Sequence, residues 1–589
     1  MKKNDIEMNS ILDKVSFRQF LKIFKQIKLP WLLMILTILS DLVMYVFSSF
    51  SKQITGNVVD SKGSISNGLL VSYAITMTLV AVMTIISYIL QGVYSEKINL
   101  RLRQKLWKKM MYIPQKNFDI DKGETLVSRV TKDCDFASTL FTTIFSAFTL
   151  IFGFVMYLVQ MYLTNGTMAS FILLLLPVSA LVGWGYGKLQ YWIGQRTQAT
   201  LSDSTTYLIE RTKNFNLVKA SNTQKLEEAV GSKQFEEQYK IDIKTGWVQG
   251  LSSVITNGLN IFSMAITFIF GGMLVSKHVL TTGNIVTFYI FSTALASMFS
   301  NFISYFGSIK LTIGSLARIT KIFEIESEEL DKGLELDVPD ADIIFKDVDF
   351  AYSDKESTLK DFTCIIPKNK TTAVIGANGS GKTTMFKLLE RFYNTDQGEI
   401  LFGNTNINDF KVSSWRKAFA LVAQDHPLME GTIRENIVYG CEREVTEEEL
   451  KEVAKMANLT ELVESLPDGF DSYVAPEGRN FSGGQRQCVA IARAIMHNPD
   501  YLLLDEATSS LDAKCERTVV DGFGKFMKNR TVVIIAHNLS AIRNADNVIV
   551  LKKGKIAASG SPQDILKTSI DYRDFVMKHK NAGEGMAYR

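Results

Sequence analysis

The chain has 589 residues, of which 46% are hydrophobic, 21% are charged and five are cysteines, and its formal net charge is +4. A charge this small, with no basic stripe, argues against a nucleic-acid-binding protein. The cysteines lack metal-ligand spacing and predict reduced thiols rather than a disulfide framework. The length would suffice for several soluble domains, but the distribution of apolar residues argues against that organisation.

Six long apolar segments in the first half of the chain predict transmembrane helices. Each is close to the roughly 20 residues that an α-helix needs to cross a bilayer. They cover Pro30–Phe50, Leu69–Val93, Thr139–Leu163, Thr167–Trp184, Val254–Val275 and Ile285–Gly307. We therefore expect a membrane protein with an all-α, six-helix transmembrane domain in the lipid bilayer.

Lys and Arg indicate which ends of these helices face the cytoplasm, because cytoplasmic loops retain positive charge. The N-terminal segment is basic, and its residues 15–28 suit a helix lying in the inner membrane interface. The connection between the second and third spans is also strongly basic, whereas the opposite connections carry few charges, among them Lys52 and Lys62. We expect both termini in the cytoplasm, and the abundance of Lys, Ile and Asn favours a bacterial cytoplasmic membrane.

Asp41 is the one clear acid deep in a predicted span, about 16 Å along the first helix from Pro30 at roughly 1.5 Å per residue. Carboxylates inside a membrane are costly and often line a cavity. We expect Asp41 either to bind a cationic part of a transported molecule or to have a structural role. Weaker polar candidates for the same cavity are Gln91, Gln160, Asn257, Asn260 and Asn301.

After Ile322 the composition changes to an acidic run that ends at Pro339, which predicts a domain boundary. Beyond it, β-rich segments alternate with helical ones. The β-rich segments are Asp342–Tyr352, Thr371–Ile375, Tyr501–Leu504 and Thr531–Ala536. This alternation predicts a cytoplasmic α/β domain with a largely parallel sheet.

A glycine-rich stretch follows the apolar segment Thr371–Ile375 and precedes a predicted helix, Thr383–Arg391. It contains Gly376, Asn378, Gly379, Ser380, Gly381, Lys382, Thr383 and Thr384. In this context backbone N–H groups wrap the phosphates of a nucleotide, Lys382 supplies a positive charge and the Thr383 hydroxyl can ligate Mg²⁺. The stretch by itself predicts a nucleotide-binding P-loop.

A second motif follows farther along the chain, where Ser482, Gly483, Gly484 and Gln485 begin a predicted helix, Gly483–Met496, and Leu504-Asp505-Glu506 comes behind it. Together with the P-loop, this pattern resembles the ATP-binding cassette transporters. The closest resemblance is to exporter-type (type IV) half-transporters, in which six helices are fused to one cassette. It spans essentially the whole chain and implies an ATPase that uses ATP and Mg²⁺.

The resemblance implies roles for residues of the ATP site. Tyr352 matches the aromatic residue that stacks on adenine, and Gln424 matches the residue that reaches both Mg²⁺ and the attacking water. Asp505 would hold Mg²⁺ together with Thr383, and Glu506 would act as general base.

The same resemblance implies contacts beyond a single cassette. His537 would contact the γ-phosphate, and Asp512 would communicate between two ATP sites. Ser482–Gln485 would grip the phosphates of a nucleotide held mainly by a partner cassette, with the N-terminus of the following helix favouring the anion. Residues 113–129 and 210–228 resemble the regions through which such cassettes contact the membrane helices.

This reading divides the chain into an N-terminal segment, 1–28, a transmembrane domain, 29–322, an acidic linker, 323–341, and a nucleotide-binding domain, 342–589. The leading function is ATP-driven export of an amphipathic or hydrophobic molecule by a dimer, most simply of identical chains. Export of a ribosomally made peptide, and an importer or regulatory gate on the same fold, remain alternatives.

Overall fold

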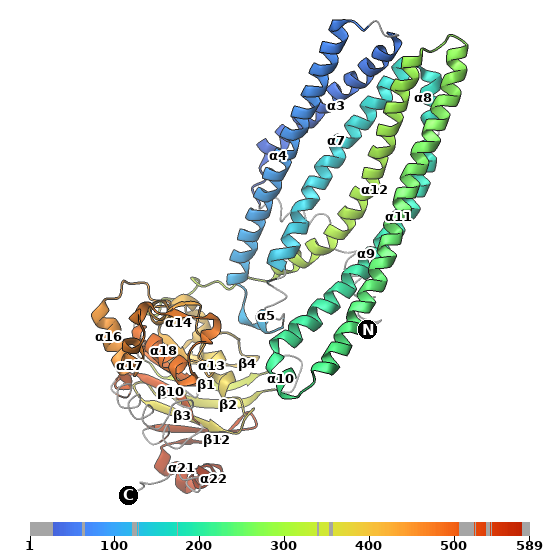
Figure 1. Cartoon of the computed structure of the whole chain (residues 1–589). Helices are drawn as coiled ribbons and strands as arrows, with labels where there is room; N and C mark the ends of the chain where they lie inside the picture. Colours follow the sequence, from blue (N-terminus) through green and yellow to red (C-terminus); the bar gives the residue numbers. More distant parts are fainter. Residues whose placement is uncertain are drawn as a thin grey trace. The chain divides into compact units, whose positions relative to one another are not determined.

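The computed structural model describes residues 27–61, 65–120, 127, 129–173, 175–337, 341–352, 357–505, 524, 526–536, 542 and 545–579. The chain forms two compact units (Figure 1). One comprises Met1–Met111 and Asp121–Glu326, and the other comprises Tyr112–Ile120 and Ser327–Arg589. We call the first the helical unit and the second the cassette unit.

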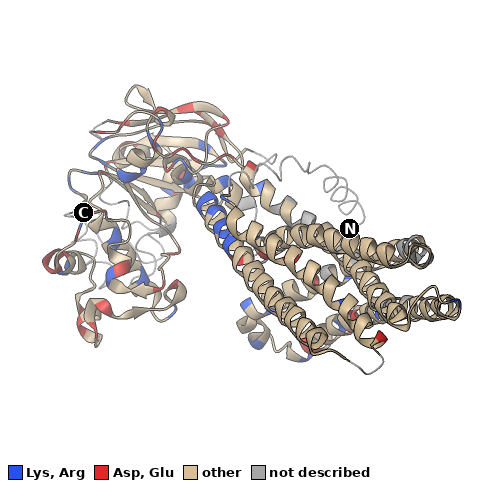
Figure 2. Cartoon of the chain, turned by 90° about the horizontal axis from the view of Figure 1, so that it is seen from above, with Lys and Arg blue, Asp and Glu red and all other residues tan. Residues whose placement is uncertain are grey.

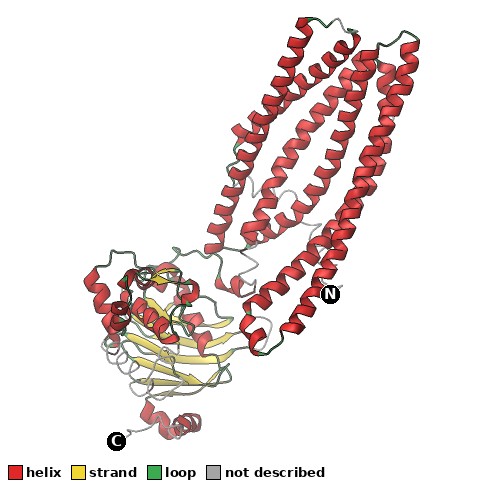
Figure 3. Ribbon diagram, in the orientation of Figure 1, coloured by secondary structure: helices red, strands yellow, loops and turns green. Residues whose placement is uncertain are grey.

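The described residues of the helical unit form helices and no strands (Figure 3). The helices are α3 (Trp31–Asp60), α4 (Asn67–Met111), the π-helical turn η1 (Arg129–Asp133), α7 (Cys134–Thr164), α8 (Gly166–Leu173), α9 (Leu175–Lys213), α10 (Phe215–Ala220), α11 (Gln224–Ser276) and α12 (Thr282–Glu324). Long stretches of them carry neither basic nor acidic side chains (Figure 2), as the interior of a bilayer requires.

Five segments of the described chain are long and apolar enough to cross a membrane: Trp31–Asp60, Asn67–Met111, Arg129–Thr164, Gln224–Ser276 and Thr282–Phe302. They contain or overlap five of the six predicted spans. The other predicted span, Thr167–Trp184, falls on α8 and α9, between which residue 174 lies outside the described residues.

Several helices are much longer than a bilayer is thick. α4 has 45 residues and α11 has 53, which at about 1.5 Å per residue gives lengths of about 68 and 80 Å, against a hydrocarbon core of about 30 Å. These two helices are therefore long enough to cross a bilayer and extend well beyond it.

The first membrane helix extends beyond its predicted end. Hydropathy placed the end at Phe50 and Lys52 in the following loop, but α3 continues to Asp60, so the placement of Lys52 was wrong. The Lys52 ammonium donates hydrogen bonds to Ser48 Oγ (2.6 Å) and Tyr157 Oη (2.8 Å). Helical hydrogen bonding can continue where apolar character stops, because these polar side chains find partners on the same helix and on α7.

Asp41 lies half-buried in α3, and its carboxylate accepts a hydrogen bond from Ser87 of α4. Two of the weaker polar candidates also have partners on neighbouring helices. Gln91 donates to Ser146 Oγ (2.9 Å), and Gln160 accepts from Gln53 (2.5 Å). These hydrogen bonds join α3 to α4, α4 to α7, and α3 to α7.

Two glycines allow α3 and α12 to approach each other closely. A Cβ atom at Gly283 would lie 2.1 Å from the carbonyl oxygen of Gly56, and a Cβ at Gly56 would lie 2.1 Å from Thr287 Oγ1. Beside this crossing, the Asp60 carboxylate accepts hydrogen bonds from Thr281 Oγ1 (2.5 Å) and the Gly283 backbone N–H (2.7 Å). Asp60 therefore caps the N-terminus of α12, where a negative charge is favourable.

The described residues of the cassette unit form three sheets. One has the order β2-β1-β4-β5, with β1 (Ile343–Phe350), β2 (Leu359–Ile366), β4 (Gln397–Phe402) and β5 (Thr405–Asn406). The largest has the order β12-β11-β3-β10-β9-β6, with β3 (Thr371–Gly376), β6 (Phe419–Val422), β9 (Tyr501–Asp505), β10 (Thr531–Ile535), β11 (Asn547–Lys552) and β12 (Lys555–Gly560). β7 (Gly431–Thr432) pairs with β8 (Tyr473–Val474). Five adjacent strands of the largest sheet are parallel, as expected.

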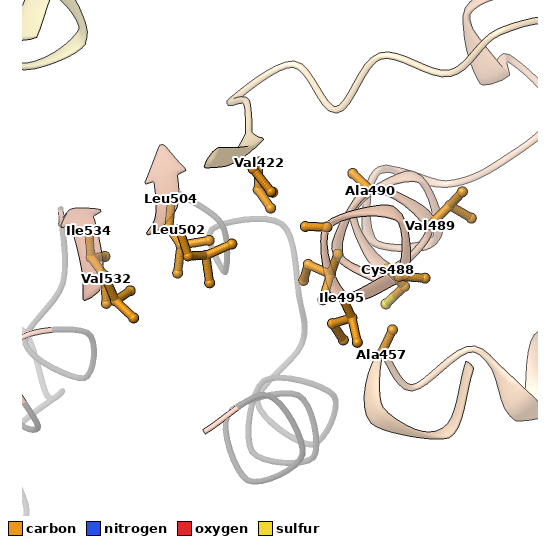
Figure 4. Close-up of a cluster of buried hydrophobic side chains, with 14 of the residues drawn as sticks. Val422, Ala457, Cys488, Val489, Ala490, Ile495, Leu502, Leu504, Val532 and Ile534 are labelled. Atoms are coloured by element: carbon orange, nitrogen blue, oxygen red, sulfur yellow. The ribbon is translucent and has the colours of Figure 1, made fainter. Parts of the chain in front are cut away.

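The described helices that follow or lie between these strands are α13 (Lys382–Leu389), α14 (Val412–Lys417), α15 (Ile433–Ile437), α16 (Glu447–Met456), α17 (Thr460–Ser465), α18 (Gly483–Met496), α21 (Pro562–Thr568) and α22 (Ile570–His579). The short helix α5 (Gln115–Ile120), from the first half of the chain, also belongs to this unit. Short 3₁₀ turns lie at Ile407–Asp409, Gly469–Asp471 and Pro476–Gly478. Apolar residues of α18 and of β6, β9 and β10 share one buried core (Figure 4), which fixes α18 to the parallel sheet.

The acidic linker is bound to the cassette unit along residues 328–336, which we call the strap. Leu334 pairs with the segment 409–411: its N–H donates to the Asp409 carbonyl and its own carbonyl accepts from Lys411, both at 2.8 Å. Gly333 has φ +121°, and a Cβ atom there would lie 2.4 Å from the Asp409 carbonyl oxygen. The strap is therefore fitted closely to the surface that it crosses.

Candidate nucleotide-binding site

A cleft of about 460 Å³ opens where β3 and β9 of the parallel sheet end. The carboxyl ends of parallel strands are the usual place for ligands in such sheets. Its described lining is Tyr352, Thr358, Asn378, Gly379, Gly381, Lys382, Thr383, Thr384, Gln424, Asp505 and Ile535. Eight of these eleven come from three separate predicted motifs: the P-loop, the loop after β6 and the end of β9.

The P-loop turns from β3 into α13 through two glycines with left-handed backbone. Gly379 has φ +77° and Gly381, the N-cap of α13, has φ +106°. A Cβ atom at Gly381 would lie 2.6 Å from Leu359 Cδ2, so both conformation and space require glycine there. The buried Ser380 hydroxyl has no hydrogen-bond partner among the described residues. A glycine-lined turn at a helix N-terminus with an unpaired hydroxyl fits a phosphate group.

Lys382 and Thr383 begin α13, and hydrogen bonds orient both side chains. The Lys382 ammonium donates to the carbonyl oxygens of Gly376 (2.9 Å) and Ala377 (3.2 Å), which holds it over the loop. The Thr383 hydroxyl donates to Asp505 Oδ2 (3.3 Å) at the end of β9. A hydroxyl and a carboxylate placed together are oxygen ligands of the kind that Mg²⁺ binds.

Tyr352 follows β1 and lies at the edge of the cleft. Its ring makes edge-to-face contacts with Phe350 (centroids 5.0 Å apart) and Tyr393 (5.2 Å), and its hydroxyl lies 3.0 Å from Thr384 Oγ1. The Lys387 ammonium lies 5.2 Å from the ring centroid. These contacts fix the ring where a nucleotide base could stack on it.

The signature residues Ser482–Gln485 form the N-terminus of α18, as predicted. Ser482 and Gln485 make a capping box: Ser482 N–H donates to Gln485 Oε1 (2.8 Å), and Gln485 N–H donates to Ser482 Oγ (3.2 Å). Ser482 is exposed. None of these four residues is among the described residues that line the cleft. The P-loop and the signature of one chain thus do not form one pocket in the described structure.

Three predicted site residues, Glu506, Asp512 and His537, lie outside the described residues. Their positions stay predictions from sequence. Asp505, the residue before Glu506, is 6% exposed and ends β9 at the cleft.

Hydrogen bonds of Asn436 and Arg493 connect the loop that follows Gln424 to α18, and neither residue was predicted from the sequence. The Asn436 amide accepts from Met429 N–H (2.9 Å) and donates to the carbonyl oxygens of Met429 (2.8 Å) and Thr432 (3.0 Å). Arg493 of α18 donates to the Asn436 carbonyl (2.8 Å), to its side-chain oxygen (3.0 Å) and to the Pro427 carbonyl (3.1 Å).

Thr358 and Ile535 also line the cleft and were not predicted. Ile535 ends β10 in an apolar strand whose pattern gives no sign of a ligand. Thr358 comes just before β2, on a sheet that the sequence did not connect with the P-loop. Neither residue lies in a motif, so only the fold could reveal them.

The regions expected to contact the membrane helices are partly described. Residues 115–120 form α5, which belongs to the cassette unit, and 215–220 form α10, which belongs to the helical unit. Residues 121–126 and 128 lie outside the described residues.

The fold and the cleft together define a membrane-embedded protein with a helical transmembrane unit and an α/β P-loop unit in one chain. Residues 31–299 match the family model of the ABC transporter transmembrane region, and residues 359–509 match that of the ABC transporter. The chain is 31% identical to a multidrug resistance ABC transporter ATP-binding and permease protein of Lactococcus lactis over 99% of both chains. The chain therefore belongs to the ABC transporter family, whose members hydrolyse ATP to drive transport.

Two further similarities agree with this family. An ATP-dependent lipid A-core flippase of Haemophilus influenzae is 30% identical over 81% of this chain and 82% of its own length. The structure of a bacterial Atm1-family ABC exporter with ATP bound superposes with a TM-score of 0.81 at 22% identity, covering 94% of this chain and 98% of the other. The structural similarity shows that the fold is that of an ABC exporter.

Proposed function

We propose that this chain is half of a homodimeric exporter that moves amphipathic or hydrophobic molecules out of a bacterial cytoplasmic membrane, with both termini in the cytoplasm. The names of its relatives support this class of cargo, since one is a multidrug resistance transporter and another a lipid A-core flippase. The basic N-terminal segment and the basic region around Lys97 and Arg101 support the orientation.

One observation supports the proposal that two chains act together as a dimer. The signature Ser482–Gln485 is ordered by its own capping box, yet it is absent from the described lining of the cleft that holds the P-loop. A capped helix N-terminus with an exposed serine is a favourable place for a phosphate. We infer that this terminus serves a nucleotide held by the P-loop of a second chain.

The residues of the cleft suit ATP hydrolysis. Bound Mg²⁺–ATP would supply the γ-phosphoryl group and the metal charge that stabilises its transfer. Lys382 and the P-loop backbone would bind phosphate oxygens, Thr383 and Asp505 would hold Mg²⁺, and Gln424 would orient the attacking water. Glu506 would accept a proton from that water as general base.

His537 and Asp512 complete the proposed site, with His537 contacting the γ-phosphate and Asp512 linking the two sites of the dimer. Asp41 keeps a proposed second role beside its contact with Ser87, as a group that attracts a cationic part of the cargo. Asp41→Asn should then reduce transport of cationic molecules only; unchanged transport of every cargo class would remove this role.

The test uses the purified full chain alone in lipid nanodiscs. Wild-type protein should hydrolyse ATP without a second kind of chain, and a panel of lipids, drugs and peptides should identify the class that stimulates it. Glu506→Gln should bind ATP and trap a closed pair of chains but lose hydrolysis. Glu464→Gln, an exposed acid of α17, is the matched control and should hydrolyse normally.

Three results would contradict the proposal. Hydrolysis that appears only after addition of a different half-transporter would contradict the homodimer. Wild-type turnover in Glu506→Gln would contradict its role as general base. Stimulation by peptides alone would replace the proposed cargo class.

A further inference from the structure

The cytoplasmic exits of two membrane helices are tied together where the cassette unit begins. α4 ends at Met111 and α12 ends at Glu324. Within the helical unit, the Lys109 ammonium donates a hydrogen bond to the Ile325 carbonyl. Within the cassette unit, the Glu328 N–H donates to the Tyr112 carbonyl (2.6 Å). One hydrogen bond therefore joins the ends of α4 and α12 in the helical unit. Another joins the residues that follow these two helices in the cassette unit.

Glu328 also binds the cassette through its side chain. Its carboxylate accepts two hydrogen bonds from the Arg416 guanidinium, at 2.9 Å from Nη1 and 2.6 Å from Nη2. The side chains are 21% and 27% exposed, respectively, so water screens the pair only in part. A bidentate pair of this kind fixes geometry as well as charge.

Arg416 connects this ion pair to the end of the P-loop helix. Its Nε donates to the Glu390 carbonyl (3.0 Å) and its Nη2 donates to the Arg391 carbonyl (3.0 Å), the two residues directly after α13. Its guanidinium carbon lies 5.1 Å from the ring centroid of Phe392. An arginine bound to the carbonyls that directly follow a helix is held to that helix end, and we expect it to move with it.

Electrostatics connect Glu328 to the same arginines. Burial lowers the pKa of Arg391, the positive charge of Arg416 lowers it further, and Glu328 and Asp409 oppose both effects. Removal of the Glu328 charge would leave Arg416 without its bidentate partner beside Arg391. The strap should then lose its link, through Arg416, to the end of α13.

We propose that Glu328 and Arg416 are a positioning pair that transmits the state of the P-loop to the membrane: a shift of α13 moves Arg416, Glu328 and the joined exits of α4 and α12. The inference rests on the ATP-driven transport proposed above, for which a cassette can move a membrane helix only through a mechanical contact. It adds a path that uses the linker itself.

The strap contains a matched control. Glu335 pairs with Lys411 at 2.5 Å, and in the described part of the chain neither side chain makes a hydrogen bond or ion pair with α13 or with Tyr112. Its exposed fraction, 49%, is also higher than that of Glu328. Glu335→Gln therefore removes one negative charge from the same strap without cutting the proposed path.

The test measures hydrogen–deuterium exchange in the full chain in nanodiscs, with and without a non-hydrolysable ATP analogue and Mg²⁺. In wild type, the analogue should slow exchange at 376–389 and also change exchange at 105–112 and 319–328. In Glu328→Gln the first effect should remain and the second should disappear. Glu335→Gln should behave as wild type. Arg416→Lys keeps the charge but cannot reach all its acceptors, and it should lose most of the second effect.

A transport assay provides a second measurement, in which the movement of a membrane-partitioning fluorescent dye is compared with the amount of ATP hydrolysed. Glu328→Gln should hydrolyse ATP at the basal rate but move about tenfold less dye per ATP, a typical size for coupling between two sites. An unchanged response at 105–112 and 319–328 in Glu328→Gln, or its absence in wild type, would overturn the inference. A wild-type protein with the exchange response but no dye transport would instead contradict the proposed cargo.

Discussion

Replacement of Asn436 by alanine tests whether the loop after Gln424 depends on a single buried amide. Asn436 is 1% exposed, and its side chain makes four hydrogen bonds, with Met429 (twice), Thr432 and Arg493. At about 1 kcal/mol for each bond, and more for the charged one, their loss destabilises the cassette by about 4 kcal/mol. Partial relaxation of the loop reduces this to about 3 kcal/mol.

The assay is thermal unfolding of the full chain in nanodiscs, with ATPase kinetics in parallel. For a unit of this size, about 3 kcal/mol lowers Tm by about 6–12 °C. The loosened loop should also lower kcat, because Gln424 lies at its start and lines the cleft. Asn408→Ala removes an exposed amide and should change Tm by less than about 2 °C. A change as small as this in Asn436→Ala would refute the argument that the amide anchors the loop.

Two further predictions concern packing and pH. Gly283→Ala places a Cβ 2.1 Å from the Gly56 carbonyl and should lower the yield and Tm of the folded protein, whereas Gly272→Ala, with nothing within 4 Å, should not; equal values for both would refute the tight crossing. Burial lowers the pKa of His426, so protonation favours the unfolded chain and stability is lost as pH falls below about 6.5, by up to about 1.4 kcal/mol per pH unit. The free energy of unfolding, measured at pH 7.5 and 5.5, should show this loss in wild type and in His497→Gln. The loss should be smaller in His426→Gln. Equal losses in all three proteins would refute the assignment of this pH dependence to His426.

Much of the site could be predicted because its geometry is local. The P-loop fixes its own turn through Gly379 and Gly381, and it lies between β3 and α13 as the flanking apolar pattern indicated. α18 begins at Gly483 and ends at Met496, as predicted, because Ser482 is a strong N-cap residue with a capping-box partner. Short-range rules of this kind do not require knowledge of the tertiary fold.

The missed features depend on contacts between distant parts of the sequence. Asn436 and Arg493 are separated by 57 positions, and each is an ordinary polar residue of a short helical segment until the fold brings them together. Lys52 was misplaced because hydropathy reports apolar character and not hydrogen bonding. The acidic run was expected to be a boundary, and its pairing with basic residues near α14 was not visible in composition.

The strap has a consequence for modular exchange between transporters. A cassette transplanted from its first strand, Ile343, would leave behind Leu334 and its two backbone hydrogen bonds to the segment 409–411. The C-terminal segment of the cassette unit, which also includes Tyr112–Ile120, instead begins at Ser327. A chimaera that keeps a folded cassette should therefore be joined between Glu326 and Ser327. The transplanted part then includes the strap, although its acidic composition alone would identify it as a linker.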